Sequence, residues 1–344
     1  MKTRAVRLYG INDMRIEEFE LPAIKDDEIL AKVITNSICM SDHKAAAQGP
    51  NHKRIPKDID KNPVMLGHEL CGEIIEVGKK WKDKYHEGMR FTIQPAMNYK
   101  GTLDAPGYSF PYIGGDATYV ILPHMLMELD CVLPYAGPSY FLGSLAEPLS
   151  CVVGTFHAMY HTTAGSYVHH MGIVEGGNAA ILAGVGPMGM GAIDYAINNP
   201  DRRPGRLVVT DINQERLDRA AMLYTVEHAK KNGVELHYLN TRDLKDPNGV
   251  LMELSNGEGY DDVFVMAAVG ALIEQADAIL TKDGCLNFFA GPERTDFTAS
   301  LNFYNVHYAS THIVGTSGGN TDDLHESLKL MEQGLINPAG MVTH

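Results

Sequence analysis

Hydrophobic and polar residues alternate in short runs over the first 130 residues, and turn residues separate the runs. Alternation with a period of two is typical of strands that bury one face. The pattern predicts strands at 4–9, 14–19, 28–34, 73–77, 89–93 and 118–122, with little helix. Two long loops, 45–63 and 100–115, interrupt these strands, and loops of that length are usually functional or disordered. The first part of the chain is therefore predicted to be β-rich.

The pattern changes near residue 145 to apolar runs that alternate with helical segments. A mostly apolar segment, 147–160, predicts a helix with Pro148 in its first turn. Short apolar strands are then expected at 179–183, 207–210, 263–267, 286–290 and 313–315, with helices at 188–198, 214–232 and 271–280. Strands of this kind are buried on both faces of a parallel sheet. The second part therefore predicts a doubly wound α/β domain.

Composition adds limits to this picture. A chain of 344 residues exceeds one ordinary hydrophobic core, so two domains are expected. The net charge of −14 argues against nucleic acid or an anionic membrane as a partner. No apolar run approaches membrane-spanning length, and the N-terminus lacks the apolar core of a secretory signal. Five scattered cysteines are typical of free thiols, which predicts a cytoplasmic protein.

A glycine-rich turn directly follows the strand at 179–183 and directly precedes a predicted helix. It reads Gly184-Val185-Gly186-Pro187-Met188-Gly189 and satisfies the G-x-G-x-x-G pattern of dinucleotide-binding proteins. In that pattern the first glycine makes the turn, the second admits a pyrophosphate, and the third lets the helix pack closely on the strand. Free N–H groups at the helix N-terminus then face the phosphates. The alternative is a glycine turn that serves packing only.

The type of nicotinamide cofactor is indicated by Asp211, which ends the next predicted strand. An acid at this place accepts hydrogen bonds from the adenosine ribose and repels a 2′-phosphate, which favours NAD(H). Arg216 keeps NADP(H) open as the alternative, because it could pair with that phosphate instead of being a solvated helix residue.

Candidate metal ligands occur in three separate segments. The stretch Gly67–Gly78 places His68 beside Glu69 in a turn bounded by glycines, and Cys39 and Glu147 lie before and after it. A mixed set of sulfur, nitrogen and oxygen ligands suits zinc in an open catalytic site. Spacing alone does not show that these segments meet, so each residue could also be an ordinary Cys, His or Glu.

Taken in order, these segments resemble the zinc-dependent medium-chain dehydrogenase/reductase family over essentially the whole chain. The resemblance rests on the residues at 39–42, 67–78 and 147–149 and on the glycine turn. Glu147-Pro148-Leu149 is the variant typical of the polyol and threonine dehydrogenase branch. Within that branch, the segment 161–177 is similar to L-sorbose-1-phosphate reductases.

The resemblance implies a GroES-like catalytic domain over 1–153 and 318–344, and a Rossmann domain over 154–317, with zinc in the cleft. Cys39 and His68 would bind the metal, and Glu69 and Glu147 would be direct or water-mediated ligands. Zinc would polarise an alcohol or ketone for hydride transfer with the nicotinamide. Ser41 resembles the hydroxyl that begins a proton relay, and it could also cap the following turn with Asp42, since the two roles can coexist.

Three departures from the family pattern affect these expectations. Residues 94–107 lack the four cysteines of a structural zinc lobe, so one catalytic zinc and no structural zinc are expected. The position of the relay's terminal histidine holds Lys44, with His43 one residue early. Relatives continue beyond the segment 341–344 with a further helix, so the catalytic domain is expected to be truncated at its C-terminal part.

The expected substrate is a small ketose or its polyol in phosphorylated form, with L-sorbose 1-phosphate reduced to D-glucitol 6-phosphate. Candidate phosphate contacts are the basic residues near Cys39, namely His43, Lys44, His52, Lys53 and Arg54, although a solvated basic loop is an equal alternative. The histidines His157, His161, His169 and His170 match no metal-binding spacing and are expected on a polar surface. An unphosphorylated polyol or amino alcohol is the alternative substrate.

The family also implies a homo-oligomer, a dimer or tetramer, formed by pairing of the strand at 313–315. A catalytically silent dinucleotide-binding protein is the remaining alternative, but such a protein has no physical need for an open zinc site.

Overall fold

The computed structural model describes residues 1–343, so His344, the last residue of the predicted catalytic domain, lies outside the description. The described residues divide into two compact units. The first comprises 1–150 and 319–332, and the second comprises 151–318 and, of the remaining described residues, 333–343. No helix within residues 1–343 is both long and apolar enough to cross a membrane.

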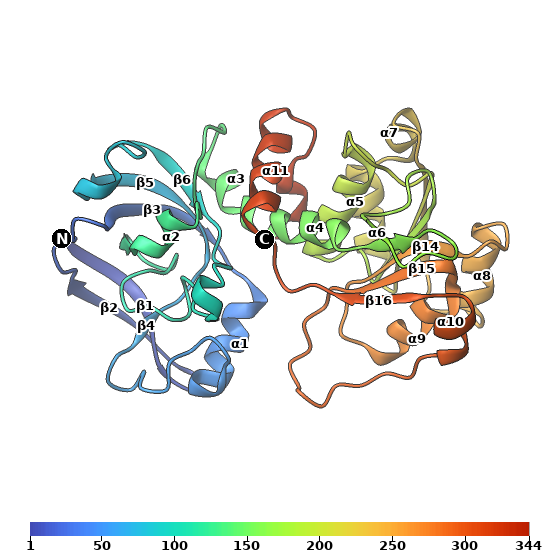
Figure 1. Ribbon diagram of the computed structural model, residues 1–344, viewed down its shortest axis with the longest axis horizontal. Helices are drawn as coiled ribbons and strands as arrows, with labels where there is room; N and C mark the ends of the chain where they lie inside the picture. Colours follow the sequence, from blue (N-terminus) through green and yellow to red (C-terminus); the bar gives the residue numbers. More distant parts are fainter. Residues whose placement is uncertain (344) are drawn as a thin grey trace. The chain divides into compact units, whose positions relative to one another are not determined.

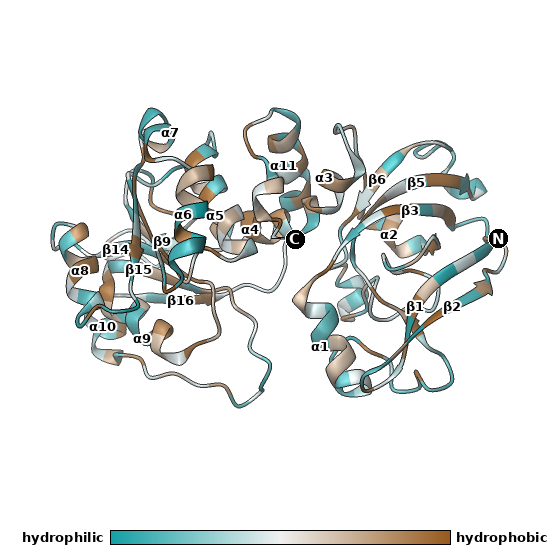
Figure 2. Cartoon of the chain, turned by 180° about the vertical axis from the view of Figure 1, so that it is seen from behind, coloured by the Kyte–Doolittle hydropathy of each residue, from teal (hydrophilic) through white to brown (hydrophobic). Residues whose placement is uncertain are grey.

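The first unit is built on antiparallel strands, as the alternating pattern predicts (Figure 1). A five-stranded sheet has the order β7-β3-β5-β6-β8, and a smaller sheet has the order β2-β1-β4. The strands are β1 (Lys2–Gly10), β2 (Asp13–Glu20), β3 (Ile29–Ser37), β4 (Val64–Met65), β5 (Glu69–Val77), β6 (Arg90–Ile93), β7 (Tyr119–Leu122) and β8 (Val132–Pro134). Figure 2 shows hydrophobic residues along β5, and its Leu70 and Ile74 are fully buried in the core of this unit.

Helices and 3-10 turns complete the first unit. They are α1 (Met40–Gln48), α2 (His124–Glu128), α3 (Tyr140–Ser144), α4 (Ala146–His157, which runs on into the second unit), α11 (Thr321–Glu332), η1 (Gly49–Asn51), η2 (Lys79–Trp81) and η3 (Tyr99–Gly101). Helix α1 lies in the region predicted to contain little helix. Its buried side chains are Asp42, Ala45 and Ala46, which are polar or small, so it shows no apolar stripe.

The second unit contains the predicted doubly wound fold. Among its described residues, six parallel strands pair in the order β13-β12-β11-β14-β15-β16. These strands are β11 (Asn178–Leu182), β12 (Arg206–Asp211), β13 (Glu235–Asn240), β14 (Tyr260–Val265), β15 (Leu280–Phe288) and β16 (His312–Gly315). The accompanying elements are α5 (Pro187–Asn198), α6 (Gln214–Leu223), α7 (Val226–Lys231), α8 (Pro247–Leu254), α9 (Gly270–Ile279), α10 (Phe303–Tyr308), η4 (Pro338–Met341) and the hairpin β9 (Tyr160–Thr162) and β10 (His169–Met171).

Two predicted helices have different bounds in the structure. The helix expected at 214–232 is divided into α6 and α7, because the Thr225 side chain caps a new helix by accepting from the His228 N–H. The helix expected at 147–160 ends at His157, and Tyr160 begins strand β9.

The segment 333–344 is predicted to belong with the catalytic domain, whereas its described part, 333–343, clusters with the second unit. Its 3-10 turn, η4, packs on α5. The Asn337 N–H donates to Asp194 at 3.0 Å, and Arg219 donates to the carbonyl groups of Gly340 and Val342 at 3.0 and 2.7 Å. These bonds tie the end of the chain to α5 and α6.

Of the four histidines predicted on a polar surface, His161 is placed differently. Its Nε2 donates to the buried Asp262 carboxylate at 3.0 Å, and its Nδ1 donates to the Asp283 carbonyl at 2.9 Å. Burial alone would lower the pKa of His161, but the hydrogen bond and charge of Asp262 raise it above its usual value. His161 therefore links the β9–β10 hairpin to the central sheet, whereas His157, His169 and His170 are exposed.

The contact between α5 and the chain end predicts a pH-dependent stability. Burial raises the pKa of Asp194 to about 6 in the fold, from an ordinary value of 3.8. Because the folded pKa is the higher one, the protonated form favours folding, and stability is lost as the carboxyl ionises between these values, by about 3 kcal/mol. Asp194→Asn should therefore raise the unfolding midpoint relative to wild type more at pH 7.5 than at pH 4.5.

Calorimetry at the two pH values measures this difference. The exposed Asp201→Asn variant is the matched control and should follow wild type at both. A parallel response of wild type and Asp194→Asn would contradict the assignment of the pH dependence to Asp194.

Candidate active site

A cluster of possible metal ligands forms where β3 ends and β5 begins. The two strands are antiparallel neighbours, and Ser37 pairs with Glu69 in their register. Cys39 lies just beyond the end of β3, and His68 precedes the first residue of β5. The ligand atoms of Cys39, His68 and Glu69 all lie within 4.8 Å of one another. The sheet thus joins segments that the spacing alone leaves apart.

Cys39 also begins helix α1. Its side chain accepts a hydrogen bond from the Ser41 N–H at 3.4 Å, and the Asp42 side chain accepts from the Cys39 N–H at 3.2 Å. Of the cap expected from Ser41 and Asp42, the part of Asp42 is confirmed, whereas the side chain that accepts at the helix start is that of Cys39 and Ser41 contributes its backbone N–H. Burial raises the pKa of the Cys39 thiol, an effect opposed by its hydrogen bond with His68.

The His68 ring is buried, and Asp42 fixes its orientation. Nδ1 of His68 lies 3.0 Å from Oδ1 of Asp42. Since a carboxylate accepts, Nδ1 carries the hydrogen, which leaves Nε2 for a metal. Burial alone would lower the pKa of His68, but the hydrogen bonds to Asp42 and Cys39 raise it well above its usual value. Sequence reasoning missed this role of Asp42.

Glu69 is buried beside His68 and accepts a hydrogen bond at Oε2 from the hydroxyl of Ser37. The Ser37 hydroxyl also lies 3.1 Å from the carbonyl oxygen of Ser144. Burial raises the pKa of Glu69, and the charge of His68 opposes that rise. Ser37 is a second residue that the sequence did not indicate.

Glu147 lies in the first turn of α4 and is also buried. It is not one of the three residues whose ligand atoms lie within 4.8 Å of one another. Its charge nevertheless contributes to the raised pKa of His68. The structure therefore brings Cys39, His68 and Glu69 together and places Glu147 outside this close group.

Tyr108 belongs to the second of the two predicted long loops and packs against the cluster. Its ring centroid lies 4.9 Å from that of His68, and its hydroxyl lies 3.4 Å from Nε2 of His68. Two glycines permit this approach: a Cβ on Gly107 would lie 2.3 Å from the carbonyl oxygen of Gly67. Both glycines have a positive φ, of 77° and 89° respectively, which favours glycine.

The residues present fit a zinc ion. One thiol, one imidazole and one carboxylate converge with their ligand atoms within 4.8 Å of one another, and this mixed set of sulfur, nitrogen and oxygen ligands is one that zinc binds. Zinc-binding histidines commonly donate a hydrogen bond to a carboxylate from the ring nitrogen that does not bind the metal, and Asp42 accepts such a bond from His68.

The glycine turn of the second unit lies between β11 and α5, as predicted. A Cβ on Gly184 would come within 2.7 Å of Ile181, and one on Gly189 within 2.1 Å of the Gly184 carbonyl oxygen. A Cβ on Gly186 would meet no atom within 4 Å. Gly186 is also the N-cap of α5, formed without a side-chain hydrogen bond, and Pro187 and Met188 begin the helix. An open backbone at a helix N-terminus fits a pyrophosphate.

Asp211 is the last residue of β12. Its Oδ1 accepts from the N–H groups of Ile212 and Asn213 at 2.8 and 2.9 Å, which orients the carboxylate at the start of the next turn. Arg216 is exposed on α6.

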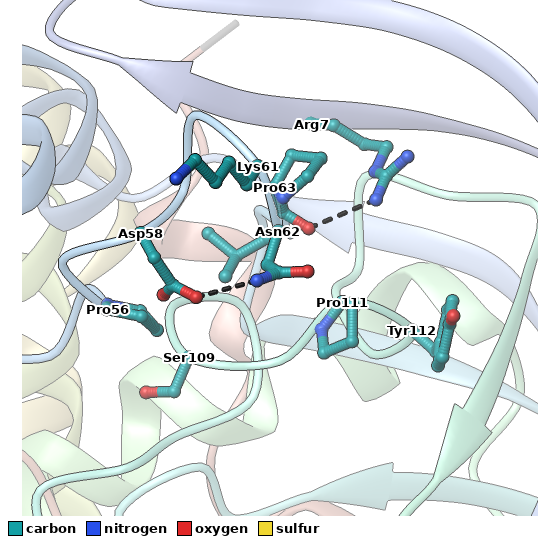
Figure 3. A pocket seen from close by; sticks show the side chains of 10 residues that line it. Arg7, Pro56, Asp58, Lys61, Asn62, Pro63, Ser109, Pro111 and Tyr112 are labelled. Atoms are coloured by element: carbon teal, nitrogen blue, oxygen red, sulfur yellow. Dashed lines mark hydrogen bonds between the residues drawn. The ribbon is translucent and has the colours of Figure 1, made fainter.

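A separate cavity of about 400 Å³ lies in the first unit (Figure 3). It contains none of the predicted site residues, and its side chains include the hydrogen-bonded pair Asp58 and Asn62. Its lining is Arg7, Pro56, Asp58, Lys61, Asn62, Pro63, Val64, Ser109, Pro111 and Tyr112. We therefore do not place the reaction there.

Known proteins show the same combination of domains. The model of the alcohol dehydrogenase GroES-like domain matches residues 25–130, and that of zinc-binding dehydrogenases matches residues 187–333. The chain also shares the fold of a 2R,3R-butanediol dehydrogenase from Bacillus subtilis, with a TM-score of 0.77 at 22% identity. That alignment covers 99% of this chain and 91% of the other. The predicted GroES-like and Rossmann folds are confirmed.

Two relatives are much closer in sequence. Mannitol-1-phosphate 5-dehydrogenase of Aliivibrio fischeri is 54% identical over 100% of this chain and 81% of its own length. L-sorbose 1-phosphate reductase of Klebsiella pneumoniae is 49% identical over 99% of this chain and 82% of its own length. The chain belongs to the zinc-binding medium-chain dehydrogenase family, in its polyol dehydrogenase branch. It is an enzyme, a zinc-binding dehydrogenase that uses a nicotinamide cofactor.

The bond between Asp42 and His68 predicts an effect on zinc affinity. The Asp42 carboxylate uses one oxygen for His68 and the other for the Cys39 N–H, whereas an asparagine has only one acceptor oxygen. Asp42→Asn should therefore weaken zinc binding about 10–100-fold, the usual effect of removing such a partner. Competition with a fluorescent chelator measures this affinity.

The exposed Asp60→Asn variant should bind zinc like wild type. Unchanged zinc affinity in Asp42→Asn would show that this carboxylate does not support the metal ligand.

Proposed function

We propose that the protein interconverts a phosphorylated ketose and the corresponding phosphorylated polyol, with NAD(H) as its cofactor. The observation that carries this proposal is the cluster of half-buried Cys39 with buried His68 and Glu69, in a chain 54% and 49% identical to relatives named for phosphorylated sugars and polyols. Two substrate pairs follow from those names. They are L-sorbose 1-phosphate with D-glucitol 6-phosphate, and fructose 6-phosphate with mannitol 1-phosphate.

In this proposal Cys39 and His68 bind one zinc ion, and Glu69 is a direct third ligand. Glu147, outside the close group, acts through water. Bound zinc supplies a Lewis acid that polarises the substrate oxygen, and the nicotinamide accepts or donates the hydride. The chain's own contribution is the fixed geometry: Asp42 holds the His68 ring and Ser37 holds Glu69.

Ser41 is proposed as the first group of the proton path, on the first turn of α1 two residues from Cys39. The N–H groups of Gly186, Met188 and Gly189 at the start of α5 are proposed to hold the pyrophosphate, and Pro187, which has no N–H, sets the first turn of the helix. Gly184 makes the turn, and Asp211 binds the adenosine ribose.

A homo-oligomer is proposed to form through β16. This strand lies at the edge of the parallel sheet, and its Ile313 is exposed. An unpaired edge strand is a ready surface for pairing with a second copy.

An unphosphorylated polyol is the second candidate substrate. Its support is a sorbitol dehydrogenase of Bacillus subtilis, which is 26% identical over 87% of this chain. That likeness is weaker than the likeness to the two relatives named for phosphorylated compounds.

A rate assay separates these substrates. Purified protein with NADH should reduce phosphorylated ketoses faster than free sorbose or fructose. Chelation should abolish the rate, and added zinc should restore it, because the substrate oxygen needs a Lewis acid. Equal rates with free and phosphorylated ketoses would contradict the phosphorylated substrate, and activity that survives complete metal removal would contradict the zinc mechanism.

Cofactor choice is tested at Asp211. Asp211→Ala should lower kcat/KM for NADH about 10–100-fold, because a hydrogen bond to a charged group contributes about 1.5–3 kcal/mol. The preference for NADH over NADPH should narrow, since the repulsion of a 2′-phosphate is also removed. Asp218→Ala, which changes an exposed acid on α6, is the control. No change in the NADH-to-NADPH ratio would show that Asp211 does not face the ribose.

A further inference from the structure

Three side chains from the two long loops of the first unit form a stack next to His68. We call His52, Arg54 and Tyr108 the cation–aromatic stack. The His52 and Tyr108 rings are nearly parallel, with centroids 5.6 Å apart and 12° between their planes. The guanidinium carbon of Arg54 lies over the Tyr108 ring, 5.4 Å from its centroid.

The two loops are joined by hydrogen bonds around this stack. The Ser109 hydroxyl donates to the Arg54 carbonyl oxygen at 2.7 Å, and the Arg54 N–H donates to Nδ1 of His52 at 3.3 Å. The packing of Gly107 on Gly67 holds the same loop against the turn that carries His68. The position of Arg54 relative to His68 is therefore set by the backbone of both loops.

Arg54 has no acidic partner among the described residues. Its Nε is buried and makes no hydrogen bond, and within residues 1–343 the guanidinium pairs with no carboxylate. A buried donor without a partner is costly and is rare in folded proteins. A planar guanidinium binds phosphate with two parallel hydrogen bonds, so this geometry is suited to a phosphate group.

The surroundings are also strongly positive. Burial and then the charges of Arg54, Lys53 and Lys44 lower the pKa of His52 to about 4, so His52 is neutral at pH 7. The stack combines one guanidinium without an acidic partner with a neutral imidazole that can accept or donate a hydrogen bond. An anion bound beside Arg54 would offset the electrostatic cost of holding this positive charge without an acidic partner.

We propose that Arg54 binds the phosphate of the substrate and that this phosphate lies at the end of the sugar chain far from the reacting carbon. This inference rests on the proposed function, because it assumes that a zinc ion held by Cys39, His68 and Glu69 binds the reacting oxygen.

The distances between Arg54, Tyr108 and His68 indicate which end of the sugar chain carries the phosphate. The Tyr108 hydroxyl lies 3.4 Å from Nε2 of His68, the nitrogen left for the metal. The Arg54 guanidinium carbon and the His68 ring centroid lie 5.4 and 4.9 Å from the Tyr108 ring centroid, so their separation is at most the sum of these two distances. A phosphate bound by Arg54 would therefore lie beside Tyr108, at a distance from His68 that a short sugar chain can span.

The two substrate pairs place the phosphate differently. In L-sorbose 1-phosphate the ester is on the carbon beside the ketone, so the phosphate stays next to the proposed zinc site. In fructose 6-phosphate four carbon–carbon bonds of about 1.5 Å each separate the ketone carbon from the esterified carbon. In this proposal the longer chain of fructose 6-phosphate reaches past Tyr108 to Arg54, whereas a phosphate beside the ketone stays near His68. The stack therefore favours fructose 6-phosphate, with mannitol 1-phosphate as its polyol.

Steady-state kinetics of Arg54→Gln and Arg54→Lys test the inference. For fructose 6-phosphate, Arg54→Gln should raise KM about 10–100-fold with little change in kcat, as expected for the loss of charge-assisted hydrogen bonds. Arg54→Lys should recover part of this loss, because lysine keeps the positive charge but cannot form the two parallel hydrogen bonds of a guanidinium. Lys57→Gln removes one exposed charge from the same loop and is the matched control. It should change KM by much less than Arg54→Gln does.

Three kinetic results would overturn the inference. A fall in kcat/KM of Arg54→Gln that is equal for fructose 6-phosphate and free fructose would show that Arg54 only supports the packing of Tyr108. A rise in KM for Lys57→Gln as large as that for Arg54→Gln would show that the substrate responds to the overall positive charge of the loop and not to a phosphate site at Arg54. A larger effect with L-sorbose 1-phosphate than with fructose 6-phosphate would overturn the placement of the phosphate at the far end.

Titration calorimetry with inorganic phosphate tests the site without catalysis. Wild type and Lys57→Gln should bind phosphate with the same affinity, and Arg54→Gln should bind it about tenfold more weakly or worse, as the loss of a charge-assisted pair implies. If no phosphorylated ketose is reduced but this pattern is found, the proposed function fails and the anion site stands. If phosphorylated ketoses are reduced and phosphate binds equally to all three proteins, Arg54 is not the site.

Discussion

The hydrogen bond between Asp42 and His68 is the contact on which the active site depends. Both side chains are buried, and each also has a second role in the fold. Asp42 closes the first turn of α1 on Cys39, and His68 leads directly into β5. One carboxylate therefore sets the start of a helix, the position of a thiol and the tautomer of an imidazole. Without it, the orientation of the His68 ring and the cap that positions Cys39 would be lost, and only Glu69 would keep its hydrogen bond with Ser37.

The backbone around this bond is shaped by close packing rather than by hydrophobic area. Gly67 accepts a hydrogen bond from the Gly115 N–H at 2.7 Å, and Gly107 packs on the Gly67 carbonyl oxygen. Such contacts admit no Cβ, so glycine is needed at both Gly67 and Gly107. They bring Tyr108 to His68 and, through the loop that follows α1, Arg54 to Tyr108. The same constraint that forms the metal cluster thus also forms its aromatic and cationic surroundings.

Local sequence patterns predicted those features that depend on neighbours along the chain. Strand alternation indicated the sheet of the first unit, and the glycine turn between an apolar strand and a helix indicated the nucleotide site. The resemblance to a known family supplied the grouping of Cys39, His68 and Glu69. Asp42 and Tyr108 were missed as partners of His68 because they lie 26 and 40 residues from it, so their contacts arise only from the fold. Helix α1 was missed because the residues it buries are small or polar.

The identity and number of bound metal ions provide the most direct test of this active site. Anomalous diffraction at the zinc absorption edge, recorded from crystals grown with zinc, locates each ion. We expect one peak per chain, bonded to Sγ of Cys39, Nε2 of His68 and a carboxylate oxygen of Glu69. A peak bonded to other residues, a second ion of full occupancy, or a zinc bond at Nδ1 of His68 would contradict the proposed metal site.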